Sequence, residues 1–205
     1  MTSILERRPF NVRYIVRQPS GPDPEKKRCT FGTAECNWAY IMRTNAKDEF
    51  GPTPDFASRD DLVANGRAGP MRALRQDWAD NQFWRMLDGF SLDRRPDQAT
   101  AVHMVGSLPI HDTPEQWRQT VISFVEDEIS SKGMVVDWGI HFRVADRGRP
   151  AIHPHVHILA SVRTFDRDPG RRNPAWFGSE RAERQIKERW SELTRLYPAP
   201  AALAA

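Results

Sequence analysis

A group of histidines in the second half of the sequence has the spacing of a metal site. His155 and His157 are two positions apart in HPHVHILA, so a β-strand would project both rings from one face, about 6.6 Å apart. The preceding apolar segment ends in His141, and an antiparallel neighbouring strand would lie about 4.8 Å away. Three imidazoles with open coordination positions are typical of a catalytic divalent metal, because a substrate oxygen can take a remaining position. The alternative is that His-x-His forms a half-buried polar face or a pH-responsive patch.

Two strands must position these rings. Apolar residues recur with a period of two over residues 134–141, which predicts a strand with His141 on its polar face. A loop rich in Arg, Gly and Pro then leads to a second strand over residues 153–162. Asp137 shares the strand face of His141, so it is a candidate to orient an imidazole, as is His153. For Asp137, a surface aspartate that stabilises the fold is an equal alternative.

Periodicity and helix-start signals predict the other elements. We expect strands over residues 10–16 and 99–108, helices over residues 30–44, 80–87, 113–133 and 179–196, an extended surface excursion over residues 45–70, and a basic turn over residues 167–174. The clearest start signal is Thr113 as N-cap, Pro114 at the first helical position and Gln116 completing a capping box. In the first helix, Tyr40 points about 140° away from the apolar stripe, so it is not an obvious core residue.

Length and composition favour one globular domain. The chain has 205 residues, of which 39% are hydrophobic and 28% charged, too apolar for general disorder and too polar for a membrane protein. No apolar run is long enough to span a membrane and the start does not resemble a secretory signal, so we expect a cytoplasmic protein. Cys29 and Cys36 fit neither a disulfide framework nor a Cys-x-x-Cys pair. We expect a single domain over residues 1–196 and a disordered tail over residues 197–205.

Arginine accounts for 25 of the 30 basic residues. Its planar guanidinium binds phosphate with two donors, which favours a nucleic-acid partner. Coding bias in a GC-rich genome explains the excess equally well. The residues that we expect to contact DNA are Arg43, Arg143, Arg147, Arg149, Arg171, Arg172 and, by base stacking, Trp176. The alternative for these arginines is a set of solvated loops.

Several segments, in the same order along the chain, resemble the MobA/MobL relaxases of the HUH endonuclease superfamily. The HUH motif, a bulky apolar residue between two histidines, is matched by His155, Val156 and His157. AECNWAYIMR resembles the family helix that carries a tyrosine nucleophile, QFWRML resembles the following helix, and SLPIHDTPEQW resembles a strand that ends in Leu-Pro before the next helix. The resemblance covers about residues 10–196 and implies an α/β (α+β) fold with a mainly antiparallel central sheet flanked by helices.

The resemblance also implies an activity. Tyr40 would be the nucleophile, and His141, His155 and His157 would bind a divalent metal, Mn²⁺ or Mg²⁺, with Zn²⁺, Co²⁺ or Ni²⁺ as alternatives. The enzyme would cut single-stranded DNA at an origin of transfer through a 5′-phosphotyrosine and start plasmid mobilisation or conjugative transfer, with accessory mobilisation proteins as partners. The alternatives are a replication-initiator or transposase-like nickase, a silent DNA-binding module of the same fold, and a hydrolase that uses metal and water alone.

The sequence departs from the family pattern at positions close to these residues. His153 stands where the family usually has Asn, and Phe142 replaces an acidic residue that commonly follows the first histidine. The strand before Leu-Pro often carries glutamates, whereas this chain has His103 and Val105 there. These departures predict an altered metal preference or a reduced activity.

Overall fold

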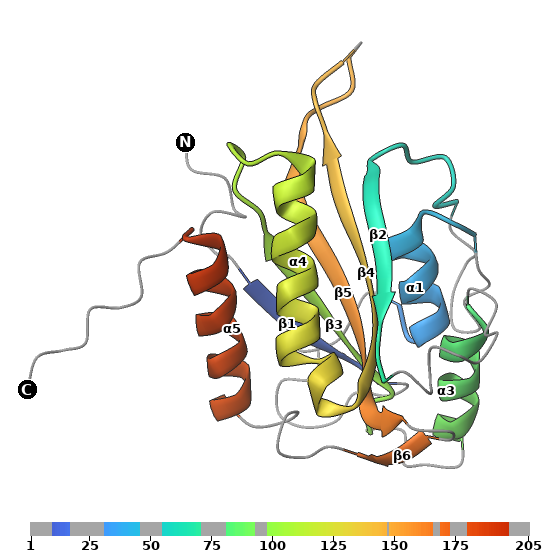
Figure 1. The fold of residues 1–205 in the computed structure, drawn as a ribbon. Helices are drawn as coiled ribbons and strands as arrows, with labels where there is room; N and C mark the ends of the chain where they lie inside the picture. Colours follow the sequence, from blue (N-terminus) through green and yellow to red (C-terminus); the bar gives the residue numbers. More distant parts are fainter. Residues whose placement is uncertain are drawn as a thin grey trace, which may run out of the picture.

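The described part of the chain is an antiparallel sheet with helices on both faces (Figure 1). The computed structural model describes residues 10–16, 31–45, 55–70, 81–92, 98–146, 148–165, 169–172 and 180–196. In sheet order the strands are β1 (Phe10–Ile15), β3 (Ala101–Ser107), β5 (Ile152–Phe165), β4 (Met134–Arg143) and β2 (Leu62–Ala68), and β6 (Pro169–Arg172) pairs with β5. Every pairing is antiparallel. The expected α+β architecture is confirmed.

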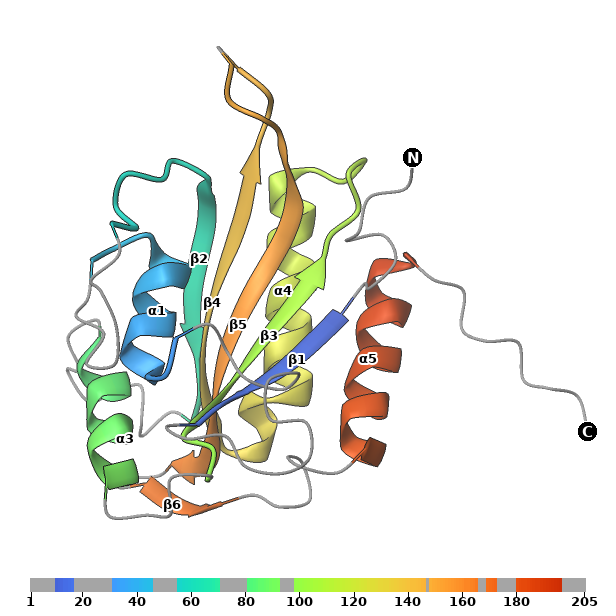
Figure 2. The same ribbon diagram turned by 180° about the vertical axis from the view of Figure 1, so that it is seen from behind.

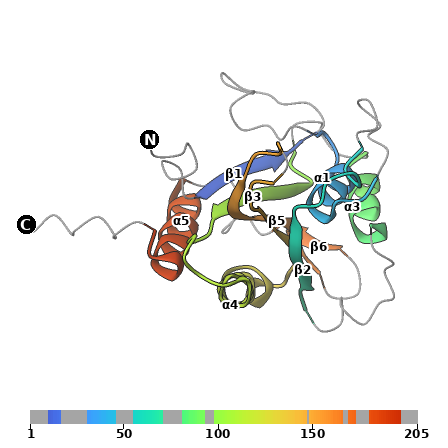
Figure 3. The same ribbon diagram turned by 90° about the horizontal axis from the view of Figure 1, so that it is seen from above.

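The helices divide between the two faces of the sheet. On one face lie α1 (Ala34–Met42) and α3 (Gln82–Leu92), as the view from behind shows most clearly (Figure 2). On the other lie α4 (Pro114–Glu128), followed by the short 3-10 turn η2 (Ser130–Lys132), and α5 (Glu180–Thr194), a separation visible from above (Figure 3). Within the described residues, the helices are too short or too polar to cross a membrane.

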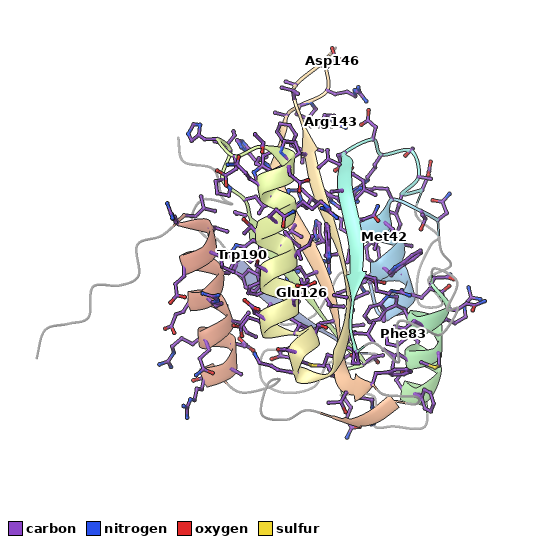
Figure 4. All side chains as sticks on the ribbon, viewed as in Figure 1. Met42, Phe83, Glu126, Arg143, Asp146 and Trp190 are labelled. Carbon is purple, nitrogen blue, oxygen red and sulfur yellow. The ribbon has the colours of Figure 1, made fainter. Side chains whose placement is uncertain are left out.

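Strand alternation gives each face its own core. Ile158 packs with Phe124 of α4 and Trp190 of α5, whereas the next residue of β5, Leu159, packs with Trp84 on the α3 side. Aromatic side chains fill both layers, and Figure 4 labels Trp190 among those on α5. The odd-numbered residues of β5 therefore face α1 and α3, and these include both histidines of the HUH motif.

Helix α1 is fixed at both ends. At its start, the Thr33 hydroxyl accepts a hydrogen bond from the backbone N–H of Cys36 at 3.2 Å. The carboxylate of Asp88 in α3 accepts two more, at 2.9 Å each, from the first two N–H groups of the helix. A carboxylate there also meets the positive end of the helix dipole. At the other end, Arg43 takes a left-handed conformation with φ 54° and closes the helix.

Most of the predicted elements are confirmed to within a few residues at their ends. The capping box of α4 forms as expected, because Thr113 accepts from the Gln116 backbone while the Gln116 side chain accepts from the Thr113 N–H at 2.7 Å. The single domain over residues 1–196 stays a prediction. The predicted tail over residues 197–205 lies outside the described residues.

Two local predictions are wrong. The surface excursion over residues 45–70 contains β2, a strand at the edge of the sheet whose sequence LVANGRA lacks apolar alternation. The expected basic turn contains β6. The strand predicted over residues 134–141 carries His141 on the expected face, and α1 covers this face, so the His141 side chain is 0% exposed.

Candidate metal and DNA-cleavage site

The strand register brings together the three histidines that the sequence singled out. His141 of β4 lies directly opposite His155 of β5, and His157 is two residues further along β5 opposite Gly139. One ring nitrogen from each histidine lies within 4.8 Å of the other two. The arrangement could therefore hold a metal ion on the face of the sheet that α1 covers.

A hydrogen-bond chain fixes the proton position on His157. The Asn37 amide donates to the backbone carbonyls of Phe31 and Thr33 at 3.0 and 2.7 Å, so its Oδ1 is an acceptor. His103 must then donate from Nδ1 to that oxygen at 3.1 Å, which leaves its Nε2 to accept from His157 Nδ1 at 2.9 Å. His157 Nε2 therefore carries a lone pair.

His155 presents a lone pair to the same point. Its Nδ1 donates to the backbone carbonyl of His153 at 2.7 Å, so its Nε2 is also unprotonated. The two Nε2 atoms of His155 and His157 are 3.2 Å apart. Two nitrogens bound at about 2.0–2.1 Å to a tetrahedral ion lie about 3.3 Å apart, so this pair fits a divalent cation.

His141 is differently engaged. Its Nδ1 accepts from Arg43 Nη2 at 2.8 Å, and its Nε2 donates to the backbone carbonyl of Ile41 at 2.8 Å. An arginine can only donate, so the lone pair of His141 points at Arg43. His141 can join the other two imidazoles as a ligand only if Arg43 releases Nδ1 or the proton moves between the ring nitrogens.

Burial keeps these rings neutral. Desolvation lowers the pKa of His103 to about 4, and desolvation together with the charge of Arg43 lowers the pKa of His141 to about 3. Burial also lowers the pKa of His155 and takes the pKa of His157 well below its ordinary value. Neutral imidazole is the form that binds metal, and a proton shared between the two Nε2 atoms is disfavoured.

Tyr40, the expected nucleophile, lies against the histidines. Its partly exposed ring is edge-on to His157 at 5.1 Å and to His141 at 6.2 Å between centroids. The Arg43 guanidinium lies 4.6 Å from the centroid of the same ring, a cation–π contact that restricts its orientation. Sequence periodicity already separated Tyr40 from the apolar stripe of its helix, and the structure places it between that helix and the sheet.

Arg43 does not suit the DNA contact expected for it. It is 8% exposed, and it forms a two-pronged ion pair with Asp61 in which both N–O distances are 2.7 Å. Burial alone would raise the pKa of Asp61, but the hydrogen bonds and charge of Arg43 lower it overall. The ion pair instead holds the Arg43 guanidinium against His141 Nδ1 and the ring of Tyr40. Asp61 was not among the predicted site residues, because it lies in the segment expected to be a surface excursion.

The expectation that Asp137 orients an imidazole is also wrong. Its buried carboxylate pairs with Arg67 at 2.6 Å through each oxygen and accepts from the Trp84 indole at 2.6 Å. Asp137 thus ties β2 and α3 to β4. The group that orients a ring is His103, which accepts from His157, while His153 contributes its carbonyl oxygen with its own ring exposed.

The other predicted DNA contacts are only partly visible. Arg143 donates to Asp60 at 2.9 Å, and Arg149 pairs with the other oxygen of the same carboxylate. These bonds tie the β4–β5 hairpin, which projects beyond the sheet with Arg143 below its tip, to the segment before β2 (Figure 4). Outside the described parts of the structure lie Arg147, Trp176 and the side chains of Arg171 and Arg172.

Comparisons with known proteins agree with this architecture. The sequence model of the MobA/MobL family matches residues 34–196. "Conjugal transfer protein TraA" of Rhizobium radiobacter is 30% identical over 103 residues, and "Probable conjugal transfer protein TraA" of Sinorhizobium fredii is 33% identical over 90 residues. These matches cover 50% and 44% of this chain but 8% and 7% of the relatives, so the chain spans less than a tenth of their length.

A solved structure has the same fold. It comes from work described as "Molecular Basis of Vancomycin Resistance Transfer in Staphylococcus aureus", and it matches with a TM-score of 0.63 at 18% identity. The match covers 90% of this chain and 89% of the other. The likeness is one of fold.

Proposed function

Because the chain belongs to the MobA/MobL family, we propose that it is a conjugative relaxase that cuts one DNA strand by transesterification. The observation that carries the proposal is the placement of the Tyr40 ring 5.1 Å from His157, whose lone pair meets that of His155 at 3.2 Å. The curated relatives are named for conjugal transfer, which supports an origin of transfer as the DNA site. Accessory mobilisation proteins are the partners that such a role requires.

In the proposed reaction, the Tyr40 oxygen attacks the phosphorus of the scissile phosphate. The bond from phosphorus to the 3′ oxygen breaks as the bond to Tyr40 forms, and the 3′ oxygen leaves as a hydroxyl after taking up the proton that the phenol loses. The 5′ end stays linked to the tyrosine, so the reverse reaction can rejoin the strand. The contacts of Arg43 and His157 with the ring limit its movement, which lowers the entropic cost of attack.

His155 and His157 would hold the divalent cation, and His141 would become the third ligand once its Nδ1 is released from the hydrogen bond with Arg43. When bound, the cation would withdraw charge from the phosphate oxygens and orient the phosphate. An all-imidazole set suits Mn²⁺, Zn²⁺, Co²⁺ or Ni²⁺, and phosphate oxygens could also recruit Mg²⁺. The chain's own contribution is to keep the rings neutral and to fix His157 through His103.

The test uses overlapping single-stranded oligonucleotides that tile the DNA flanking the gene, incubated with the protein and Mn²⁺. We expect a covalent protein–DNA adduct on a denaturing gel that disappears in Tyr40→Phe. The matched control is Tyr14→Phe, because the Tyr14 hydroxyl bonds to Glu183 and its side chain packs in the core on the other face of the sheet. This variant should form the adduct as the wild type does.

Each other outcome would indicate a different function for this protein. Cleavage that survives Tyr40→Phe without an adduct would indicate a hydrolase that uses metal and water. Tight binding without cleavage would indicate a silent DNA-binding module, and cleavage within a replication origin would indicate an initiator. In His155→Ala combined with His157→Ala, calorimetric titration should lose Mn²⁺ binding, and unchanged binding would remove the proposed site.

A further inference from the structure

We propose that a pocket beside Tyr40 binds one nucleobase of the single strand, adjacent to the phosphate that is cleaved. The pocket has a volume of about 330 Å³, at the lower end of the range for small-molecule sites. This inference rests on the proposed function, since it assigns a subsite to the same substrate.

The walls of the pocket are aromatic. Phe31, Tyr40 and Phe56 all line it, and their ring centroids lie 5.2–5.8 Å from one another. Phe56 is 2% exposed, so its ring is held in place by its surroundings. Rigid aromatic surfaces beside an opening favour a flat ring that can stack on them, and every nucleobase offers such a ring.

The charge of the pocket selects for an occupant that carries phosphate. Arg13 and Arg59 both line it, and the Arg59 guanidinium lies 5.5 Å from the Tyr40 centroid. No acidic residue stands among its lining residues in the described part of the chain. A nucleotide fits such a lining, because it offers a base for the aromatic walls and a phosphate for the Arg59 guanidinium.

The pocket is continuous with the proposed cleavage site. Tyr40, His103 and His157 line the pocket. Tyr40 and His103 also contact His157, one of the three histidines of the proposed metal site. A base seated in the pocket therefore belongs to the nucleotide next to the reacting phosphate. Its seating would fix the strand before Tyr40 attacks.

Two polar side chains of the pocket, Asn37 and His103, are already engaged in hydrogen bonds, which predicts weak reading of base identity by these groups. Asn37 donates to two backbone carbonyls and accepts from His103, and both nitrogens of His103 are hydrogen-bonded. A base edge would find few donors or acceptors in these side chains. We therefore expect the pocket to respond to the presence of a base more than to which base it is.

Abasic scanning tests the inference. Single nucleotides of the oligonucleotide are replaced one at a time by abasic nucleotides, and the Kd is measured by fluorescence anisotropy in EDTA. At one position beside the nick, loss of the base should weaken binding by about 5- to 150-fold, the range for stacking on an aromatic side chain. Exchanging the four bases at that position should change the Kd by less than about threefold.

Variants of the wall connect that position to the pocket. In Phe56→Ala, the abasic penalty at the position should vanish while the penalties elsewhere remain. Phe31→Leu, at a less buried ring, should reduce the abasic penalty at this position. This variant provides the test if Phe56→Ala fails to fold. Phe90→Ala is the matched control, since Phe90 is 45% exposed on α3 and does not line the pocket.

The outcomes separate this inference from the proposed function. An adduct in Mn²⁺ together with abasic penalties that the Phe31 and Phe56 variants leave unchanged would overturn the pocket and leave the relaxase proposal standing. A preference of more than about tenfold for one base at the position would overturn recognition by stacking alone. A penalty that depends on Phe56, without any adduct, would support the pocket and overturn the proposed chemistry.

Discussion

The substitution Gly139→Ala should separate helix α1, which carries Tyr40, from the sheet. Gly139 of β4 lies beneath α1, and a Cβ added there would meet both the carbonyl oxygen and the Cγ2 of Ile41 at 2.9 Å. The Leu62 side chain, at 3.2 Å, closes a third direction. Because one of the contacts is backbone, the strain cannot be relieved by a change of rotamer alone.

The size of the effect follows from these distances. The contact with Ile41 must lengthen by about 0.5 Å to reach the ordinary limit of 3.4 Å. If α1 moves away by this amount, the bond from His141 Nε2 to the Ile41 carbonyl lengthens from 2.8 Å to about 3.3 Å, beyond the usual hydrogen-bond range. We expect a loss of about 1–3 kcal/mol in the free energy of unfolding, which lowers Tm by about 2–12 °C in a chain of this length.

The assay pairs thermal unfolding with the rate of adduct formation in Mn²⁺. Two glycines provide controls. Gly89→Ala lies on an exposed face of α3 with nothing within 4 Å of the added Cβ, so it should raise stability by about 0.5–1 kcal/mol. Gly106→Ala would meet Trp190 at 2.5 Å on the other face of the sheet, so it should lower Tm but leave the adduct rate unchanged below its Tm.

The expected signature of Gly139→Ala is therefore a fall in both Tm and adduct rate. The rate should fall by about tenfold or more, since a misplacement of under 1 Å already disturbs attack. If Gly139→Ala unfolds and reacts as the wild type does, α1 is not pressed onto β4 and the account of the site is refuted. A fall in Tm alone, as in Gly106→Ala, would also refute the coupling between helix position and chemistry.

Two further predictions concern charge. Asp137→Asn removes the buried carboxylate charge that faces the partly exposed Arg67 and should cost about 1–3 kcal/mol in the free energy of unfolding, while the Mn²⁺ affinity from calorimetry stays unchanged. An affinity loss of about tenfold would restore a role for Asp137 in orienting an imidazole. Acidification of the metal-free protein should reduce stability, because the folded-state pKa values of His103 and His141, about 4 and about 3, lie below the unfolded value near 6.5. The unfolded chain then binds more protons, so stability is full above about pH 6.5 and declines as pH falls toward 4; denaturant titrations with equal unfolding free energies at pH 7 and pH 5 would contradict this.

The sequence predicted those parts of the fold that have strong local signals. The capping box at Thr113 and the two-residue alternation of β4 and β5 depend only on neighbouring positions, and both predictions are confirmed. Strand β2 was not predicted because it is an edge strand of mixed polarity, and its partly exposed Arg67 pairs with Asp137, a residue far away in the sequence. A local pattern does not contain such a partner.

The candidate site was predicted to a similar degree. Strand parity placed His155 and His157 on one face, and antiparallel pairing brought His141 opposite them. The same reasoning failed for Asp137, because residues four apart on a strand share a face but are separated by about 13 Å. The contacts of Asn37 and Asp61 depend on how α1 and the segment before β2 dock on the sheet, which no short-range signal encodes.

The pairing of His141 with His155 lies below the tip of the projecting β4–β5 hairpin, and the ladder shifts register just beyond it, between His141 and Arg143. The irregularity allows residues to be inserted or removed toward the tip without changing which rings meet underneath. The projecting arm and the histidines can therefore diverge separately. The β4–β5 hairpin can therefore change in length and charge while His141, His155 and His157 keep the same arrangement.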